Sequence, residues 1–305
     1  MGPRRGQPAD IGRGEGGPAS ATEMAELLRG ENYIADRGAA SALFVADRLR
    51  KPLFLEGESG VGKTEMAKAF ANATGARLIR LQCYEGIDVH QALYDWNYSR
   101  QMLYIRALQE GEAGSEEIVR QVFGPDFLIR RPLLDALESE EDVVLLIDEI
   151  DRADDEFEAF LLELLSDFQV SIPEIGTITA RRRPVVMLTS NRTREVHDAL
   201  KRRCFYHWIE YPDRAREIEI LHARVPDVSD QLAEQICTVV DSLRRLDLQK
   251  PPGIGETLDW AATVQVLGGV EALEPGMLEE SIGAVLKVRE DQQKALSALS
   301  VAPSA

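Results

Sequence analysis

One glycine-rich loop constrains the fold of this chain more than any other feature of its sequence. The apolar segment 52–55 leads into Gly57, Glu58, Ser59, Gly60, Val61, Gly62, Lys63 and Thr64, and a helix-forming stretch begins at residue 65. Strand, glycine loop and helix in this order form a phosphate-binding loop. The glycines let backbone N–H groups turn inward, Lys63 can reach the β and γ phosphates, and the Thr64 hydroxyl can bind Mg²⁺. The loop therefore predicts binding of a nucleoside triphosphate.

The charge of the chain limits its partners. Its 305 residues carry 35 Lys and Arg against 52 Asp and Glu, which gives a net charge of −17. Such a field opposes binding to nucleic acid or to an anionic membrane. The best local basic run, Arg181–Arg183, precedes a predicted strand, where a solvated sheet edge is a more ordinary reading than a nucleic-acid contact. The length allows two domains with full cores.

The remaining composition argues against disulfides, zinc and export. Cys83, Cys204 and Cys237 are far apart and form no CxxC pair, and the four histidines show no metal-binding spacing. The only metal we expect is Mg²⁺ bound with the nucleotide. No apolar stretch is long enough to span a bilayer, and the N-terminus has no apolar signal core, so a cytoplasmic setting is expected.

The order of elements predicts an α/β domain followed by a helical one. Residues 1–19 are rich in Gly, Pro and Arg and are expected to be a flexible tail, and the capping box at Ser20–Glu23 begins the first helix. The predicted strands cover 52–55, 77–83, 143–148, 184–191 and 204–211. Helical patterns then cover 213–224, 229–246, 257–267 and 277–299. We therefore expect the α/β nucleotide-binding domain over 20–212 and the helical domain over 213–300.

Two carboxylates at the end of a predicted strand indicate hydrolysis of the nucleotide. The apolar strand Val143–Asp148 is followed by Glu149. Asp148 can hold Mg²⁺ through water, and Glu149 is placed to polarise the attacking water. For these carboxylates, the alternative is a solvated strand end followed by an acidic stretch. For the glycine loop, the alternative is a glycine turn that matches the motif by chance. The presence of both motifs argues against both alternatives.

Polar and basic residues at the next strands complete the predicted site. Asn191 ends the strand after Asp148 and can position the same water or sense the γ phosphate, although a simple turn is the alternative. Arg202 and Arg203 precede the last strand and are candidates for an arginine finger, which neutralises charge on the transferred phosphoryl group. We favour Arg203, which lies closer to that strand; a surface ion pair is the alternative.

These motifs, with helices behind them, resemble the AAA+ ATPases, and more narrowly the MoxR-type AAA+ ATPases. The narrower resemblance rests on Asn32–Arg37, Leu78–Gly86 and Ala92–Tyr98, which are similar to the CoxD-like branch of accessory ATPases for carbon monoxide dehydrogenase maturation. The resemblance covers residues 24–290. It implies a P-loop AAA+ core with a five-stranded parallel sheet flanked by helices, followed by a small all-α lid.

The resemblance also implies ligands, an assembly and a partner. ATP with Mg²⁺ is the expected nucleotide, with Tyr33 and Ile34 near the adenine. A homo-oligomer in the form of a hexameric ring is implied, with the finger acting across a subunit boundary and a von Willebrand factor A-type protein as partner. Insertions at 94–127 and a hairpin around 171–179 are implied to face the pore or the client, although ordinary connections are the alternative.

One departure from the family pattern concerns the lid. Many relatives carry a second sensor arginine near the start of the third lid helix, but residues 251–269 contain no arginine. Sensing of the γ phosphate by the lid is therefore in doubt. Arg202 and Arg203, or another basic residue, would have to supply the charge.

Four functions share these motifs. The leading hypothesis is an ATP-hydrolysing chaperone that remodels a metalloenzyme client during metal-cofactor insertion into a molybdenum-type oxidoreductase. A rubisco-activase-like enzyme activator differs only in its client. A nucleic-acid motor or clamp-loader-type ATPase is opposed by the net charge. A nucleotide-sensing scaffold with little turnover is opposed by the intact set of Lys63, Asp148, Glu149 and Asn191.

Overall fold

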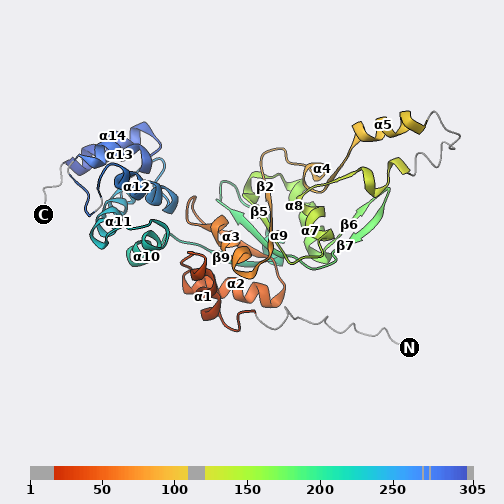
Figure 1. Cartoon of the computed structure of the whole chain (residues 1–305), viewed down its shortest axis with the longest axis horizontal. Coiled ribbons are helices and arrows are strands. Elements are labelled where there is room, and N and C mark those ends of the chain that lie inside the picture. The colour runs from red at the N-terminus through yellow and green to blue at the C-terminus, as the bar shows by residue number, and fades with distance from the viewer. Residues whose placement is uncertain (1–16, 109–120, 270, 275, 301–305) are drawn as a thin grey trace.

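A parallel sheet of five strands forms the centre of the molecule (Figure 1). The computed structural model describes residues 17–108, 121–269, 271–274 and 276–300. The sheet has the order β2-β5-β8-β1-β9, and all neighbouring strands run parallel. Its strands are β1 (Leu53–Glu56), β2 (Arg77–Gln82), β5 (Val143–Asp148), β8 (Val185–Ser190) and β9 (Phe205–Trp208). The predicted α/β fold with a five-stranded parallel sheet is confirmed.

The strand lengths follow from burial. Every residue of β5 and β8 is buried, as expected for inner strands covered on both faces. The last strand is shorter than the predicted range 204–211. Its pairing with β1 ends where the Ile209 N–H donates to the carbonyl of Glu56, and the chain then turns away toward the C-terminal helices.

Two apolar layers cover the two faces of the sheet. Leu53, Leu55 and Leu146 pack against one group of helices, whereas Phe54 and Leu145 pack against the other. The first group is α1 (Ala21–Gly30), α2 (Arg37–Leu49) and α3 (Lys63–Thr74). The second group is α7 (Pro132–Glu138), α8 (Asp155–Asp167) and α9 (Asp198–Arg203). The alternation along each strand therefore decides which helix layer each side chain meets.

The predicted start of the first helix is confirmed. The Ser20 hydroxyl accepts the N–H of Glu23 at 3.2 Å. The Glu23 carboxylate accepts the N–H of Ala19 at 2.8 Å, one residue earlier than a standard capping box. Residues 1–16 of the predicted tail lie outside the described residues.

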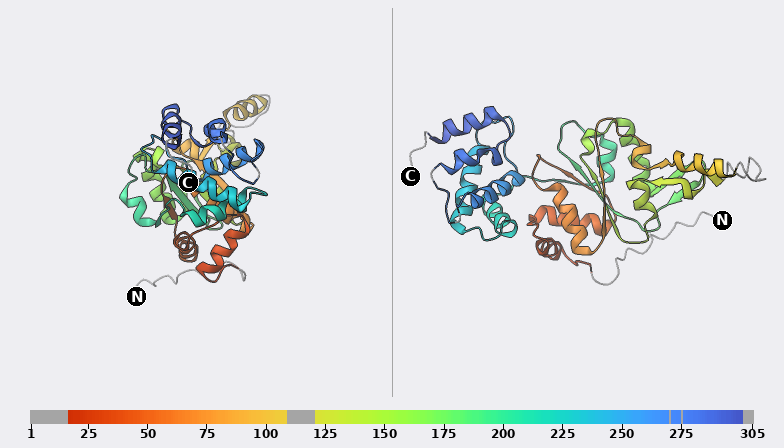
Figure 2. Two further views of the ribbon diagram at one scale, coloured as in Figure 1. Left: turned by 90° about the vertical axis from the view of Figure 1, so that its left-hand side faces the viewer. Right: turned by 45° about the horizontal axis from the view of Figure 1, so that its top comes forward.

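The C-terminal helices form a separate apolar cluster at one end of the molecule (Figures 1 and 2). They are α10 (Arg214–Arg224), α11 (Asp230–Arg244), α12 (Ile254–Val266), α13 (Met277–Val285) and α14 (Arg289–Ser300). Trp260 is fully buried in their core. The predicted division between residues 212 and 213 falls in the connection from β9 to α10 and stays a prediction.

Two of the predicted helical ranges differ from those in the structure. The range 277–299 is two helices, because the buried Leu286 adopts an extended conformation between them. Both helices bury apolar residues in the same cluster, so their sequence pattern continues across the break. Helix α12 begins three residues before the predicted 257, since the Glu256 carboxylate accepts the N–H of Gly253 and closes the first turn.

Insertions gather at the opposite end from the C-terminal helices (Figure 1). A two-stranded sheet not predicted from the sequence joins β3 (Tyr94–Trp96) to β4 (Leu128–Arg130). Between them lies α5 (Tyr98–Leu108), while α4 (Val89–Ala92) and the 3-10 turn η1 (Pro125–Phe127) flank the sheet. The predicted hairpin is confirmed as β6 (Gln169–Ile172) and β7 (Gly176–Thr179), an antiparallel pair. Residues 109–120 of the predicted insertion lie outside the described residues.

Within the described part of the chain, no helix has both the length and the apolar character that crossing a bilayer requires.

A buried ion pair stabilises the C-terminal helices. Arg244 of α11 donates two hydrogen bonds to Glu217 of α10, at 2.7 and 2.8 Å, and a third to the carbonyl of Pro252 at 2.9 Å. The Thr257 hydroxyl of α12 donates to the same Glu217 carboxylate at 2.9 Å. The pair thus joins three helices, and removal of one partner would leave a buried charge without compensation.

We predict that Arg244→Ala destabilises this helical region by about 3–5 kcal/mol, the range for breaking a buried pair. Hydrogen exchange followed by mass spectrometry should show faster exchange in α10–α12. Arg245→Ala is the matched control, since Arg245, which directly follows α11, is 79% exposed and pairs with Asp241 at 2.7 Å; its effect should stay within about 0.5 kcal/mol. Equal exchange in the two variants would contradict the prediction.

Candidate nucleotide-binding and hydrolysis site

The glycine loop holds a buried ammonium group. Gly60 and Gly62 adopt φ angles of 81° and 94°, a left-handed conformation that favours glycine, and α3 begins directly after them. Lys63 is buried, and its Nζ donates to the carbonyls of Gly57 and Glu58, both at 2.7 Å. Burial lowers the pKa of Lys63 to about 8, against the opposing effect of nearby carboxylates. An anion in the loop would compensate this charge.

Asp148, at the end of β5, is the centre of a polar cluster. Its carboxylate accepts hydrogen bonds from the hydroxyls of Thr64, at 3.0 Å, and Thr189, at 2.5 Å. Thr189 lies on β8 and was not singled out from the sequence. Its hydroxyl also accepts the N–H of Glu149 at 2.9 Å, so a single side chain fixes both acidic residues.

Glu149 and Asn191 lie beside each other, as their positions at neighbouring strand ends require. Glu149 has a φ of 55°, an uncommon conformation for a residue with a side chain. The Asn191 amide donates to one oxygen of its carboxylate at 3.4 Å, and Arg152 donates to the other at 3.3 Å. The predicted water activator and the predicted sensor therefore share one hydrogen-bonded group.

The acidic stretch after Glu149 holds the loop that begins at Asn191. Asp151 is buried and accepts the N–H of Asn191 at 3.2 Å and both the N–H and the hydroxyl of Thr193, at 2.9 and 2.7 Å. Glu158, also buried, accepts the N–H of His197 at 2.7 Å and pairs with Arg194. Sequence reasoning missed both roles, because nothing local distinguishes these carboxylates from solvated ones.

A cleft of about 660 Å³ brings most of the predicted residues together. Tyr33 and Ile34 line it on one side, and the ring of Tyr33 lies next to Gly62. The predicted residues that line the cleft are Tyr33, Ile34, Ser59, Gly60, Val61, Gly62, Lys63, Thr64, Asp148, Glu149 and Asn191. Its size suits a nucleotide. Gly57 and Glu58 do not line it, but their carbonyls hold Lys63.

The C-terminal helices close one side of the cleft. The N–H of Ile254, at the start of α12, donates to the carbonyl of Gly60 at 3.0 Å. Gly253 lies so close to the loop that a Cβ atom there would be 2.8 Å from the Gly60 Cα. The backbone at the start of α12 therefore touches the glycine loop.

Two arginines of α10 line the cleft and were not found from the sequence. Arg216 pairs with Asp36 at 3.0 Å, and Arg224 pairs with Glu65 at 3.4 Å. Both pairs join α10 to the nucleotide-binding side. Two positive side chains of α10 thus line the cleft, and only the spacing of an amphipathic helix could have pointed to them.

The two finger candidates lie outside the cleft. Arg203 donates to the hydroxyl of Ser166 on α8 at 2.8 Å, and Arg202 lies exposed beside Asp198 at 3.9 Å. Lys201, on the same helix α9, pairs with the buried Glu56 at 3.3 Å. Because Glu56 ends β1 directly before the glycine loop, the basic helix is attached to the nucleotide-binding strand of its own chain.

The residues at the cleft suit a metal ion carried by the nucleotide. Among the described residues, no group of three or more His, Cys, Asp or Glu side chains is arranged to hold a metal. Thr64 and Asp148 supply only two oxygen ligands, so phosphate oxygens and water would have to complete the shell. Mg²⁺, which keeps several waters, suits such a partial site.

Comparison with known proteins assigns the domain that carries this site to a family. A family model for the AAA domain (dynein-related subfamily) matches residues 52–204, which span β1 to the end of α9. The chain belongs to this family of AAA domains. One solved structure similar to this AAA domain chain is the RuvB Holliday junction branch migration motor of Thermotoga maritima. It is 16% identical, with a TM-score of 0.44, and the match covers 93% of this chain and 73% of that one.

Membership in the AAA domain family assigns the general chemistry. AAA+ domains bind nucleotide, usually with Mg²⁺, and hydrolyse it, so this chain is an AAA+ ATPase in general class. The MoxR-type branch and the roles of single residues go beyond this assignment.

We predict that Glu149→Gln lowers ATP turnover by about 10²- to 10⁴-fold, the usual contribution of a general base, because an amide cannot take the proton of the attacking water. ATP affinity should change little, since the amide keeps the size of the carboxylate. Turnover and nucleotide binding are measured separately on the same preparation. Glu156→Gln, an exposed position on α8, is the matched control. Normal turnover in Glu149→Gln would refute its assignment as water activator.

Proposed function

We propose that this AAA+ ATPase is a MoxR-type remodelling chaperone that works as a ring and acts on a protein client. The client we favour is a metalloenzyme of the molybdenum-type oxidoreductase class, assisted by a von Willebrand factor A-type partner, at the stage of metal-cofactor insertion. The family match supports ATP hydrolysis. The sequence resemblance supports the branch, and one surface feature supports a protein client.

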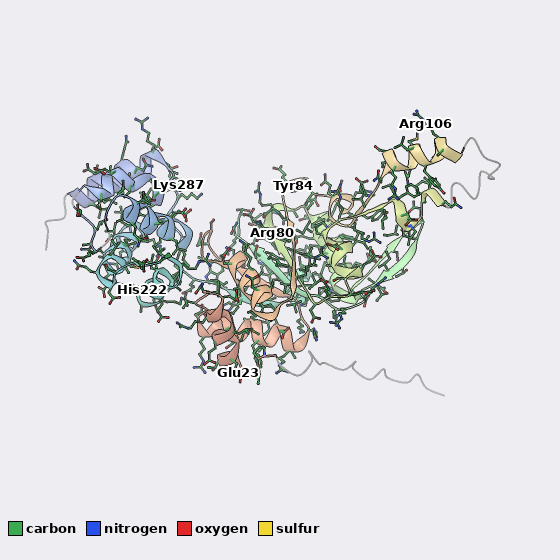
Figure 3. All side chains as sticks on the ribbon, viewed as in Figure 1. Glu23, Arg80, Tyr84, Arg106, His222 and Lys287 are labelled. Atoms are coloured by element: carbon green, nitrogen blue, oxygen red, sulfur yellow. The ribbon has the colours of Figure 1, made fainter. Side chains whose placement is uncertain are left out.

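The observation that carries this proposal is the apolar surface of α5. Tyr98, Met102 and Leu103 are 63%, 55% and 68% exposed. Large exposed apolar side chains that gather on one element are typical of protein–protein contact sites. Figure 3 places Arg106 of the same helix far from Arg80 at the central sheet, so this surface is separate from the cleft. Movements of the insertion would be transmitted to a client bound there, although the client would not contact the nucleotide.

The basic run Arg181–Arg183, a candidate for nucleic-acid contact, makes contacts within the chain. Arg181 pairs with Glu140, Arg182 pairs with Asp142 at 2.8 Å, and Arg183 lies over the ring of Phe168. These contacts, with the net charge of −17, favour a protein client over a nucleic acid.

The lining of the cleft supports the following roles in the proposed reaction. Lys63 and the loop N–H groups would hold the phosphates, and Thr64 and Asp148 would hold Mg²⁺, which neutralises charge that develops on the phosphates. Glu149 would accept a proton from the attacking water, and Asn191 would orient that water. Tyr33 and Ile34 would lie at the adenine. Arg203, outside the cleft of its own chain, would act on a neighbouring subunit.

We predict that Met102→Ser with Leu103→Ser abolishes client capture but leaves basal ATP turnover unchanged, because α5 lies away from the cleft. The measurement is a pull-down from the native host with ATP, using Glu149→Gln as a trap and Lys63→Ala as the non-binding control. Leu49→Ser, an exposed leucine on α2, is the matched surface control. Selective capture of a metalloenzyme or a von Willebrand factor A-type protein is expected.

Other captured proteins would change the proposal. Capture of an inhibited carbon-fixing enzyme would identify an activase, and capture of replication proteins or nuclease-sensitive DNA would identify a nucleic-acid motor. Capture that survives the α5 substitutions would remove the assigned client surface.

We predict that ATP turnover per subunit rises with protein concentration, because Arg203 lies outside the cleft of its own chain. Mixing Arg203→Ala subunits into the unaltered protein should depress turnover, since a finger arginine contributes about 10³- to 10⁵-fold. Arg202→Ala, mixed in the same way, tests the neighbouring candidate. A turnover per subunit that depends on neither concentration nor mixing would refute action across a subunit boundary.

A further inference from the structure

An arginine to which no role has been given above, Arg80, reaches the Asp148 carboxylate at the edge of the cleft. Arg80 lies on β2, where it pairs with Leu146 of β5, and Gln82 pairs with Asp148. Residues paired in a parallel sheet point to the same face, so Arg80 and Asp148 both face the layer that contains α3. The Arg80 guanidinium donates to one Asp148 oxygen from Nε at 2.9 Å and from Nη2 at 2.6 Å. Figure 3 labels Arg80 at this end of the sheet.

The contacts of Arg80 leave the Asp148 carboxylate saturated. An ionised carboxylate has about four positions for donors. Oδ2 accepts both N–H groups of Arg80, and Oδ1 accepts the hydroxyls of Thr64 and Thr189 at 3.0 and 2.5 Å. Thr64 also lies 3.2 Å from Oδ2. No position remains for a water bound to Mg²⁺, so one donor has to leave when the metal binds.

Arg80 is the donor that can leave most readily. Thr189 is buried and also accepts the N–H of Glu149, so its loss would disturb a second residue. Thr64 can donate to Asp148 and bind the metal through its oxygen at the same time. Arg80 is 47% exposed and also donates to the side-chain oxygen of Gln82. After it leaves Asp148, its guanidinium can therefore donate to water and to this amide. Mg²⁺ beside Asp148 would in addition repel this positive group.

We propose that Arg80 is the counterion of Asp148 while the site is empty, and that the metal–nucleotide complex displaces Arg80 when it binds. The proposal rests on the assignment of Asp148 as the metal-side carboxylate. Arg80 neutralises the buried Asp148 carboxylate while the metal is absent. Because the metal has to break this ion pair, the free energy of the pair is subtracted from that of metal binding. The guanidinium is released at the end of β2, the strand that leads toward Tyr84 and the α4–α5 insertion.

Binding of ADP, measured by calorimetry with MgCl₂ and again with EDTA, tests this role without turnover. The ratio of the two affinities reports how much the metal strengthens binding. Arg80→Ala should raise this ratio by about three- to tenfold, because the metal no longer has to break the pair. A residue that only orients Asp148 would give the opposite sign. An unchanged or smaller ratio in Arg80→Ala therefore overturns the proposal.

Arg77→Ala is the matched control. Arg77 lies on the same strand, is 49% exposed and donates two hydrogen bonds to Asp135, at 3.1 and 2.6 Å, away from the cleft. Its ratio should equal that of the unaltered chain. Arg80→Gln, which retains a single amide donor, should fall between the unaltered chain and Arg80→Ala.

If Arg80→Ala folds poorly, thermal unfolding provides a second test. In EDTA without nucleotide, the thermal midpoint of Arg80→Ala should be lower than that of Arg77→Ala, and ADP with MgCl₂ should raise it more in Arg80→Ala. No larger rise with ADP and MgCl₂ in Arg80→Ala overturns the proposal. Failure of the unaltered chain to bind ADP in either condition is a different result, since it overturns the assigned nucleotide site itself.

Discussion

A buried ammonium group is the constraint on which the rest of this structure depends. Lys63 is enclosed by the glycine loop and held by two carbonyl oxygens, and in the described part of the chain no carboxylate forms an ion pair with it. Burial disfavours its charged form, which is why its pKa falls to about 8. The surrounding elements keep this arrangement in place: β1 enters from a fully buried core, the ring of Tyr33 lies beside Gly62, and the start of α12 contacts Gly60.

The second constraint is the distribution of carboxylates. A chain with a net charge of −17 would be expected to place most of its acids in water. Around the cleft, however, Asp148, Asp151 and Glu158 are all buried, and each accepts several hydrogen bonds. These acids act as fixed acceptors that set the positions of the β8 end and of the loop after it. The precision of the site therefore comes from buried charge that is fully hydrogen-bonded.

The sequence could predict the parts of the site that are encoded locally. The glycine loop, the carboxylates at the end of β5 and the amide at the end of β8 each follow an apolar strand, and parallel strands bring their carboxyl ends to one edge. Arg80, Thr189 and Arg216 could not be predicted, because their contacts depend on the strand order and on the face of α10 turned toward the cleft. The break at Leu286 was missed because apolar periodicity reports burial and not continuity of the helix.

The ion pair between Lys201 and Glu56 has a consequence for how subunits would communicate. It attaches α9 to the end of β1, so a small displacement of that strand would be carried to the arginines at the end of the helix. In the proposed ring, these arginines face the nucleotide of the adjacent subunit. The attachment lies within one chain, whereas the arginines would act on the adjacent one. Occupancy of one nucleotide site would therefore affect one neighbouring subunit and not the other, so the proposed ring would have a direction.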